Sequence, residues 1–162
     1  MSDDRVHFAP EPSFRAEVAA ILERIIPLVR ALLPAAEVAH VGGTSIPGAM
    51  TKGDIDLLIN VPHDTVDASL LVLQIGFPDA TASASVEGML LKVPGSALPL
   101  DLLITERGAE DPAARGRARL LSDPDALAAL NRLKQRFNGK PMASYRRAKD
   151  VFFQQLLSAR SP

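Results

Sequence analysis

The chain has 162 residues, the length of one domain. Its 47% hydrophobic and 23% charged residues are typical of a globular domain with a buried core, which excludes a largely disordered chain. It contains no cysteine, so disulfides, zinc–thiolate sites and cysteine nucleophiles are excluded, and any metal must be held by oxygen or histidine ligands.

No apolar run reaches the roughly 18 residues of a membrane span, so we expect a cytoplasmic protein with no membrane partner. The net charge of −1 conceals two parts of opposite sign. Residues 1–106 hold 6 Lys and Arg against 14 Asp and Glu, a net charge of −8, whereas residues 107–162 hold 12 against 5, a net charge of +7. The acidic part suits cations and the basic part suits anions, although arginine-rich helices also occur for solubility alone.

The first predicted helix follows Ser13, the expected N-cap, and ends before Pro34. Pro27 lies inside it and predicts either a kink or the start of a second helix. Apolar residues recur at three- and four-residue steps, which indicates one buried face. They are Phe14, Val18, Ile21, Leu22, Ile25, Val29 and Leu32.

Two strands are predicted next, at 37–41 and 54–61, with a glycine-rich turn between them. A helix then begins at Asp64 as N-cap and ends at Gly76. Two further strands follow at 84–93 and 100–105, and the Pro-Gly-Ser-Ala turn between them favours antiparallel pairing.

The remainder is predicted to be helical. Asp111-Pro112 and Asp123-Pro124 each begin a helix, Asn138-Gly139 ends the second, and Ser144 is the expected cap of the last. The order of elements predicts an α+β fold with a core sheet at about 37–105 and a helical C-terminal part at about 109–158.

Three aspartates interrupt predicted apolar strands. Asp54 and Asp56 are two residues apart, so both carboxylates project to the same side with Cα atoms about 7 Å apart. Asp101 lies in a predicted strand that could pair near the strand at 54–61. If all three converge within ~5 Å, each pair repels by roughly 3 kcal/mol at an effective dielectric of 20, and a divalent cation resolves that cost. Carboxylates suit Mg²⁺ or Mn²⁺. The alternative is a solvated edge strand, or pairing with Lys and Arg.

The turn at Gly42, Gly43, Thr44 and Ser45 offers a close backbone approach, free N–H groups and two hydroxyls, which suit phosphate oxygens. By itself Gly-Gly also fits an ordinary tight turn. The conjunction of this turn with a following Asp-x-Asp strand and a later strand carrying a third Asp indicates a metal-dependent phosphate site.

Residues 40–48 read His-Val-Gly-Gly-Thr-Ser-Ile-Pro-Gly, and residues 52–58 read Lys-Gly-Asp-Ile-Asp-Leu-Leu. Together with Leu130 to Lys134 and the later Tyr145-x-x-x-Lys149 string, they closely resemble the GrpB family, a branch of the DNA polymerase beta-like nucleotidyltransferase superfamily. The resemblance covers about residues 8–158, so the chain is expected to form one GrpB-like domain over 1–162. Many GrpB-like sequences have an apolar residue where this chain has Asp54, and its presence favours an active site.

The resemblance implies a mixed twisted sheet, a metal site at Asp54, Asp56 and Asp101, and Gly43 and Ser45 near the phosphates of a nucleoside triphosphate. Gly42 and Thr44 belong to the same nucleotide-binding turn. Catalysis is assigned to the three aspartates, with Asp101 as the candidate acceptor of the proton.

Tyr145 and Lys149 lie on one helix face, and Lys134 lies on the preceding helix. The two lysines are expected to contact the β- and γ-phosphates, and Tyr145 the nucleotide. Without the family resemblance, both lysines would be read as surface residues.

The predicted function is Mg²⁺-dependent transfer of a nucleoside monophosphate from a triphosphate such as ATP to a small-molecule or protein acceptor. The alternative is a catalytically silent nucleotide- and metal-binding accessory domain linked to coenzyme A metabolism, because GrpB-like domains can be fused to dephospho-CoA kinase. A nucleic-acid partner is not expected, since only 4% of residues are aromatic. The sequence leaves the acceptor, the base and the oligomeric state open.

Overall fold

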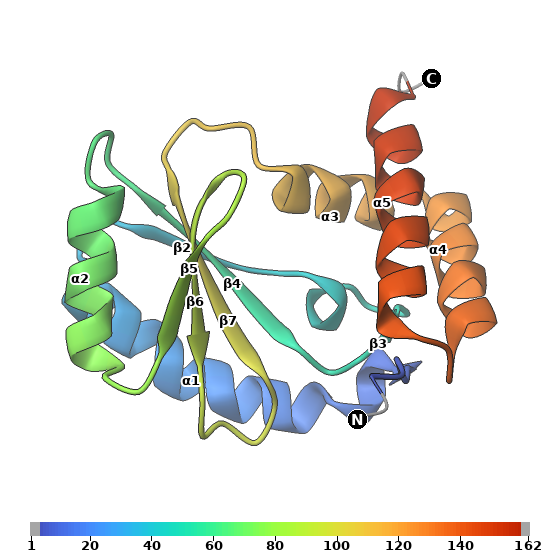
Figure 1. Ribbon diagram of the computed structural model, residues 1–162, viewed down its shortest axis with the longest axis horizontal. Helices are drawn as coiled ribbons and strands as arrows, with labels where there is room; N and C mark the ends of the chain where they lie inside the picture. Colours follow the sequence, from blue (N-terminus) through green and yellow to red (C-terminus); the bar gives the residue numbers. More distant parts are fainter. Residues whose placement is uncertain (1–3, 160–162) are drawn as a thin grey trace.

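Two apolar strands, β4 (Ile55–Val61) and β7 (Leu100–Glu106), run parallel inside a five-stranded sheet in the computed structural model, which describes residues 4–159 (Figure 1). The strand order is β2-β4-β7-β6-β5, and all the other pairs are antiparallel. The other strands are β2 (Glu37–Val41), β5 (Thr81–Ala84) and β6 (Gly88–Val93). The predicted mixed sheet and α+β fold are confirmed.

The main hydrophobic core lies between one face of this sheet and two helices, α1 (Arg15–Leu32) and α2 (Val66–Gly76). Side chains alternate along a strand, so β4 sends Ile55, Leu57, Ile59 and Val61 into this core. The intervening residues of β4 face the opposite side of the sheet, and Asp56 is one of them.

The C-terminal part forms a separate helical layer of three helices (Figure 1). They are α3 (Pro112–Ser122), α4 (Pro124–Phe137) and α5 (Met142–Ser158). A second hydrophobic cluster joins Leu120 of α3 and Leu130 of α4 to Ile46 and Ala49, which follow the glycine turn. The helical layer is thereby fixed against the turn that was predicted to bind phosphate.

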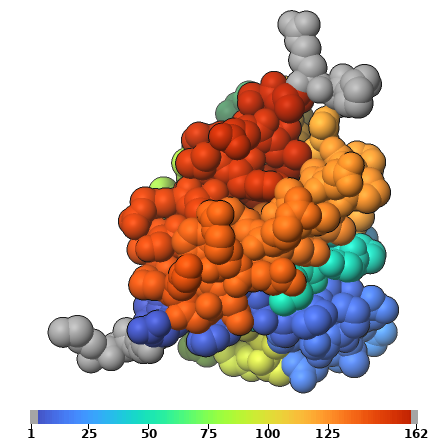
Figure 2. All heavy atoms as spheres, turned by 90° about the vertical axis from the view of Figure 1, so that its right-hand side faces the viewer, coloured from blue at the N-terminus to red at the C-terminus, as the bar shows by residue number. Residues whose placement is uncertain are grey.

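The N-terminal segment contacts both parts. Its strand β1 (Ala9–Pro10) pairs with β3 (Met50–Thr51), and a 3-10 turn, η1 (Glu11–Ser13), leads into α1. The Val6 N–H donates to Lys140 O, and the Val6 carbonyl accepts from Gly139 N–H. Figure 2 shows the blue N-terminal segment at the lower edge of this face, below the orange and red helices of the C-terminal part.

Three predicted helix caps are wrong. Helix α1 begins after Phe14, because Ser13 belongs to the 3-10 turn, and α5 begins at Met142, before Ser144. Asp64 precedes the true N-cap, Thr65, and has a positive φ of 59° while its N–H donates to the Glu106 carboxylate. Asp111 and Asp123 do cap α3 and α4 through their side chains.

Two other predicted elements differ from those in the structure. Helix α1 runs continuously through Pro27, so no second helix starts there. The predicted strand at 84–93 is the turn and second strand of the β5–β6 hairpin, and Val86 is 97% exposed at that turn. Within residues 4–159, no helix combines the length and the apolar character that crossing a membrane requires.

Candidate active site

The three aspartates that were predicted to bind metal lie at the same end of the parallel strands β4 and β7. Asp56 of β4 and Asp101 of β7 are register partners, and Asp54 lies immediately before β4 on the same side as Asp56. All three are half-buried and line one cavity. The structure therefore brings together the residues that the sequence separates by up to 47 positions.

This arrangement perturbs the acids. Burial, together with the charges of Asp54 and Asp101, raises the pKa of Asp56 to about 6. Burial also raises the pKa of Asp101. Ionised carboxylates at this place thus carry an energetic cost that a bound cation would remove.

Lysines partly offset that cost. Lys52 Nζ lies 2.8 Å from Asp54 Oδ2, and Lys92 Nζ lies 4.0 Å from Asp101 Oδ2. The three aspartates do not place one oxygen each within 4.8 Å of one another, as a set of ligands around a single ion would. Side-chain rotation and release of Lys52 would be required to surround one.

The glycine turn packs directly against the acids. Gly42 has a φ of +75°, and a Cβ built on it would lie 2.1 Å from Asp56 Oδ2. A Cβ on Gly43 would lie 2.9 Å from Thr51 Oγ1 and 3.5 Å from Lys134 Nζ. Glycine is required at 42 for both conformation and space, because the Asp56 carboxylate occupies the position of a side chain.

Thr44 and Ser45 follow Gly43 in a 3-10 turn, η2 (Gly43–Ser45), and neither lines the cavity. Thr44 Oγ1 donates to the Asp54 carbonyl at 2.9 Å, so it accepts from His40 Nε2, also at 2.9 Å. Burial and the Arg117 charge lower the pKa of His40. This chain of hydrogen bonds connects the turn to the backbone of Asp54.

Ser45 is bonded within the turn and to helix α3. Its hydroxyl donates to the Gly42 carbonyl at 2.6 Å and accepts from Arg117 Nε at 2.9 Å. Arg117 Nη2 also donates to the Ser45 carbonyl. The Ser45 side chain thus fixes the turn in this structure, and its predicted contact with phosphate stays a prediction.

The predicted cations and the tyrosine come from α4 and α5 and line the same cavity. Lys134 is only 6% exposed and donates to the Met50 carbonyl at 2.6 Å. Burial, together with the charges of Lys149 and Lys52, lowers its pKa to about 8. Burial also lowers the pKa of Lys149 and raises that of Tyr145. Among the described residues, no carboxylate forms an ion pair with the buried cation Lys134, which favours an anionic ligand here.

The cavity has a volume of about 440 Å³. Phe8, Arg117 and Arg146 also line it, and none of the three was predicted to do so. Phe8 packs edge-on against Tyr145 at 4.9 Å between ring centroids. No sequence signal marks Phe8 or Arg117, because their places depend on contacts with residues more than 70 positions away.

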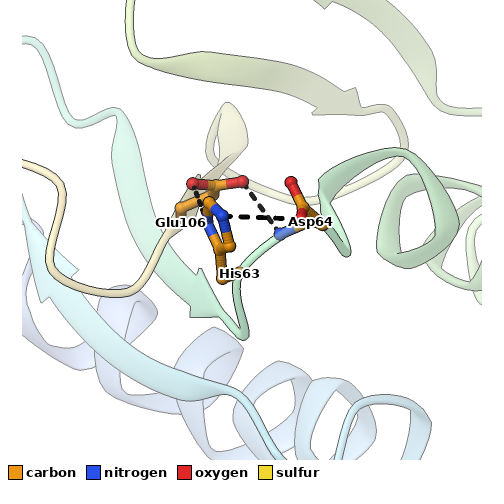
Figure 3. A group of neighbouring side chains, drawn as sticks. All are labelled: His63, Asp64 and Glu106. Atoms are coloured by element: carbon orange, nitrogen blue, oxygen red, sulfur yellow. Dashed lines mark hydrogen bonds and ion pairs between the residues drawn. The ribbon is translucent and has the colours of Figure 1, made fainter.

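A second group of ionisable side chains lies at the opposite ends of β4 and β7 (Figure 3). His63, Asp64 and Glu106 each offer a ligand atom within 4.8 Å of the other two. His63 Nδ1 lies 2.8 Å from Glu106 Oε2, and His63 and Asp64 are largely exposed. These groups hydrogen-bond and pair with one another on the surface, away from the cavity.

The model of the family described as GrpB protein matches residues 8–159. The chain belongs to the GrpB family. A crystal structure of the conserved protein GrpB from Enterococcus faecalis superposes with a TM-score of 0.71 at 17% identity, over 92% of this chain and 93% of that one. A UPF0157 protein of Vibrio cholerae is 26% identical over 156 residues, which are 95% of this chain and 83% of that protein.

Two solved structures of the Cid1 poly(U) polymerase share the fold of most of this GrpB chain. The Cid1 poly(U) polymerase, in a crystal structure with MgGTP bound, has a TM-score of 0.56 at 15% identity over 71% of this chain and 39% of its own. A second Cid1 structure has a TM-score of 0.57 at 19% identity, over 74% and 37%. These likenesses are likenesses of fold, and they agree with the fold that the resemblance to nucleotidyltransferases implies.

Proposed function

We propose that this GrpB protein is a nucleotidyltransferase that moves a nucleoside monophosphate from a nucleoside triphosphate to an acceptor hydroxyl. One observation carries the proposal: the parallel register of Asp56 and Asp101 gathers three aspartates on one face of the sheet, beside a glycine turn and a buried lysine. Acidic groups that hold a cation and donors that hold phosphates are the two requirements of phosphoryl chemistry.

The donor set fits magnesium or manganese. Asp54, Asp56 and Asp101 supply oxygen ligands only, and the space that a Gly42 side chain would fill is taken by Asp56 Oδ2, so this carboxylate is held at the cavity wall. When bound, Mg²⁺ would supply charge neutralisation for the triphosphate and a lower pKa for the acceptor hydroxyl.

The protein's own groups hold the nucleotide. The backbone at Gly42 and Gly43 can approach the phosphates closely because neither residue has a side chain. Lys134 and Lys149 lie on the same cavity and would bind the β- and γ-phosphates. Tyr145, with Phe8 packed against its ring, would contact the nucleoside.

In the reaction, the acceptor oxygen forms a bond to the α-phosphorus, and the bond from that phosphorus to the bridging oxygen of the β-phosphate breaks. Pyrophosphate leaves with the bonding electrons. The acceptor's proton passes to a carboxylate, and Asp101 is our candidate because it lies on the side of the acids away from the glycine turn.

Isothermal titration calorimetry with ATP, GTP, CTP and UTP tests the proposal, each with Mg²⁺ and then with excess EDTA. We expect saturable heat for at least one triphosphate that is lost in EDTA and in Asp56→Asn. Asp67→Asn, an exposed acid on α2, is the matched control and keeps binding. No heat for any triphosphate, in protein shown to be folded, contradicts the proposal.

The 2.8 Å ion pair of Lys52 with Asp54 supports a second function without catalysis, because Lys52 occupies one of the expected metal ligands. In that case the domain binds nucleotide without transfer and acts as an accessory domain. Release of pyrophosphate from a bound triphosphate distinguishes the two. An Asp54→Asn variant that binds nucleotide and keeps every measurable effect of the protein favours the accessory function.

A further inference from the structure

Leu90 of β6 and Leu103 of β7 are register partners that face the cavity and remain partly exposed. Leu103 is two residues beyond Asp101 on the same strand, so both project from the same face of the sheet. Neither leucine belongs to the two hydrophobic clusters of the described residues. Their apolar surface is therefore open to the cavity beside a predicted catalytic acid.

Apolar side chains of the helical layer line the same cavity. Pro112 and Ala113 of α3 and Phe153 of α5 line it. Arg117, the cavity-lining cation on α3, is bonded to Ser45 through Nε and Nη2. We call the part of the cavity at the glycine turn and Lys134 its polar end, and the part at Leu90 and Leu103 its apolar end.

The order of the strands separates the two ends. Gly42 follows β2, Asp56 and Asp101 lie on the neighbouring β4 and β7, and Leu90 lies on β6. A triphosphate bound at the glycine turn would be on one side of the acids, and the two leucines would be on the other. A molecule in contact with both leucines can present a hydroxyl to Asp101.

We propose that the apolar end of the cavity binds the acceptor, and that this acceptor carries its hydroxyl on an uncharged apolar group, such as a phenol ring or an alkyl chain. The inference rests on the proposed function, because Asp101 is the carboxylate that the acceptor hydroxyl approaches. Burial of the two leucine side chains against such a group removes apolar surface from water, whereas a sugar or a phosphate ester would place polar groups there without partners.

Methyl NMR of leucine-labelled, nucleotide-free protein tests this directly, with p-cresol and 1-pentanol as probes. We expect saturable shifts of the Leu90 and Leu103 methyl groups and none at Leu71, which is 65% exposed on α2. Glycerol, which has hydroxyls but no apolar group, is expected to cause no shift. The titration uses no nucleotide, so its outcome is independent of calorimetry with triphosphates.

In Leu103→Asn, p-cresol binding is expected to weaken at least tenfold, and in the control Leu71→Asn to stay unchanged. The methyl signals of Leu57, which is fully buried, report whether each variant is folded. If Leu103→Asn is unfolded, Leu90→Asn takes its place. Absence of saturable shifts in the wild-type protein, equal shifts with glycerol, or displacement of p-cresol by adenosine, which would make this a base pocket, overturns the proposal.

Discussion

Asp56 and Asp101 occupy matching positions on the parallel strands β4 and β7, although 45 residues separate them in the sequence. Their shared register places two carboxylates on adjacent strands, with Asp54 beside them. Burial and the mutual repulsion of the charges destabilise the ionised carboxylates, and this destabilisation can be measured in several ways.

The first concerns pH. The pKa of Asp56 is about 6 in the folded protein against an ordinary value of 3.8, so in EDTA the folded state loses stability as pH rises from about 4 to about 6. Asp56→Asn removes this penalty. We expect the variant to be more stable than wild type by up to about 3 kcal/mol at pH 8 and equal to it below pH 4. Urea unfolding at the two pH values measures the difference.

Added Mn²⁺ provides the control for this prediction. It is expected to raise the unfolding temperature of the wild-type protein at pH 8 and to leave that of Asp56→Asn nearly unchanged, because the variant lacks a charged ligand. A variant that is less stable than wild type at pH 8 in EDTA would show that Asp56 is a structural residue.

Lys52 is expected to compete with the metal for Asp54. Its ammonium lies 2.8 Å from the carboxylate, and removing it in Lys52→Met should strengthen Mn²⁺ binding about 1.4- to fivefold, the equivalent of an ion pair of about 0.2–1 kcal/mol. Lys92→Met is the matched control, since Lys92 is 4.0 Å from Asp101 and 63% exposed, and its effect should be smaller. Electron paramagnetic resonance of free Mn²⁺ measures both. Weaker binding in Lys52→Met contradicts the prediction.

Gly42 and Gly95 form a matched pair for the glycine turn. Both have a positive φ, +75° and +80°, but a Cβ at 95 would meet nothing within 4 Å, whereas a Cβ at 42 would collide with Asp56 Oδ2. Gly95→Ala should cost about 1–2 kcal/mol from backbone conformation alone. Gly42→Ala should cost more and also abolish metal-dependent nucleotide binding, as measured by denaturant unfolding and calorimetry. Equal effects would show that the turn does not position Asp56.

Thr44 connects His40 to the Asp54 backbone through two hydrogen bonds of 2.9 Å. Thr44→Val removes both hydrogen bonds from a partly buried donor and acceptor, at about 0.5–1.5 kcal/mol each, and is expected to weaken metal binding because Asp54 is no longer held. Thr44→Ser keeps the hydroxyl and should retain metal affinity. A Thr44→Val protein that binds Mn²⁺ like wild type would limit this residue to a role in stability.

Much of the fold follows from local sequence patterns. The strands β2 and β4 match their predicted apolar segments within one residue, and the Asp-Pro pairs at 111–112 and 123–124 begin helices as expected, because proline fixes the first turn. Strand β5 was missed, since Thr-Ala-Ser-Ala lacks the bulky residues that mark a strand.

The candidate site was predictable only in part. The glycine turn and the Asp-x-Asp pair are local signals, but the pairing of Asp101 with Asp56 depends on the sheet order, which periodicity does not determine. Asp64 failed as a helix cap because its N–H is bound by Glu106, a contact across 42 residues. Phe8 and Arg117 reach the cavity through similar long-range contacts, so their presence there could not be inferred from neighbouring residues.

The most direct measurement is a crystal structure grown with Mn²⁺ and a non-hydrolysable nucleoside triphosphate, with the metal located by its anomalous scattering. We predict manganese bound by Asp54, Asp56 and Asp101, with Lys52 displaced and the phosphates at the glycine turn. Manganese bound only at His63, Asp64 and Glu106, with none among the three aspartates, would contradict it.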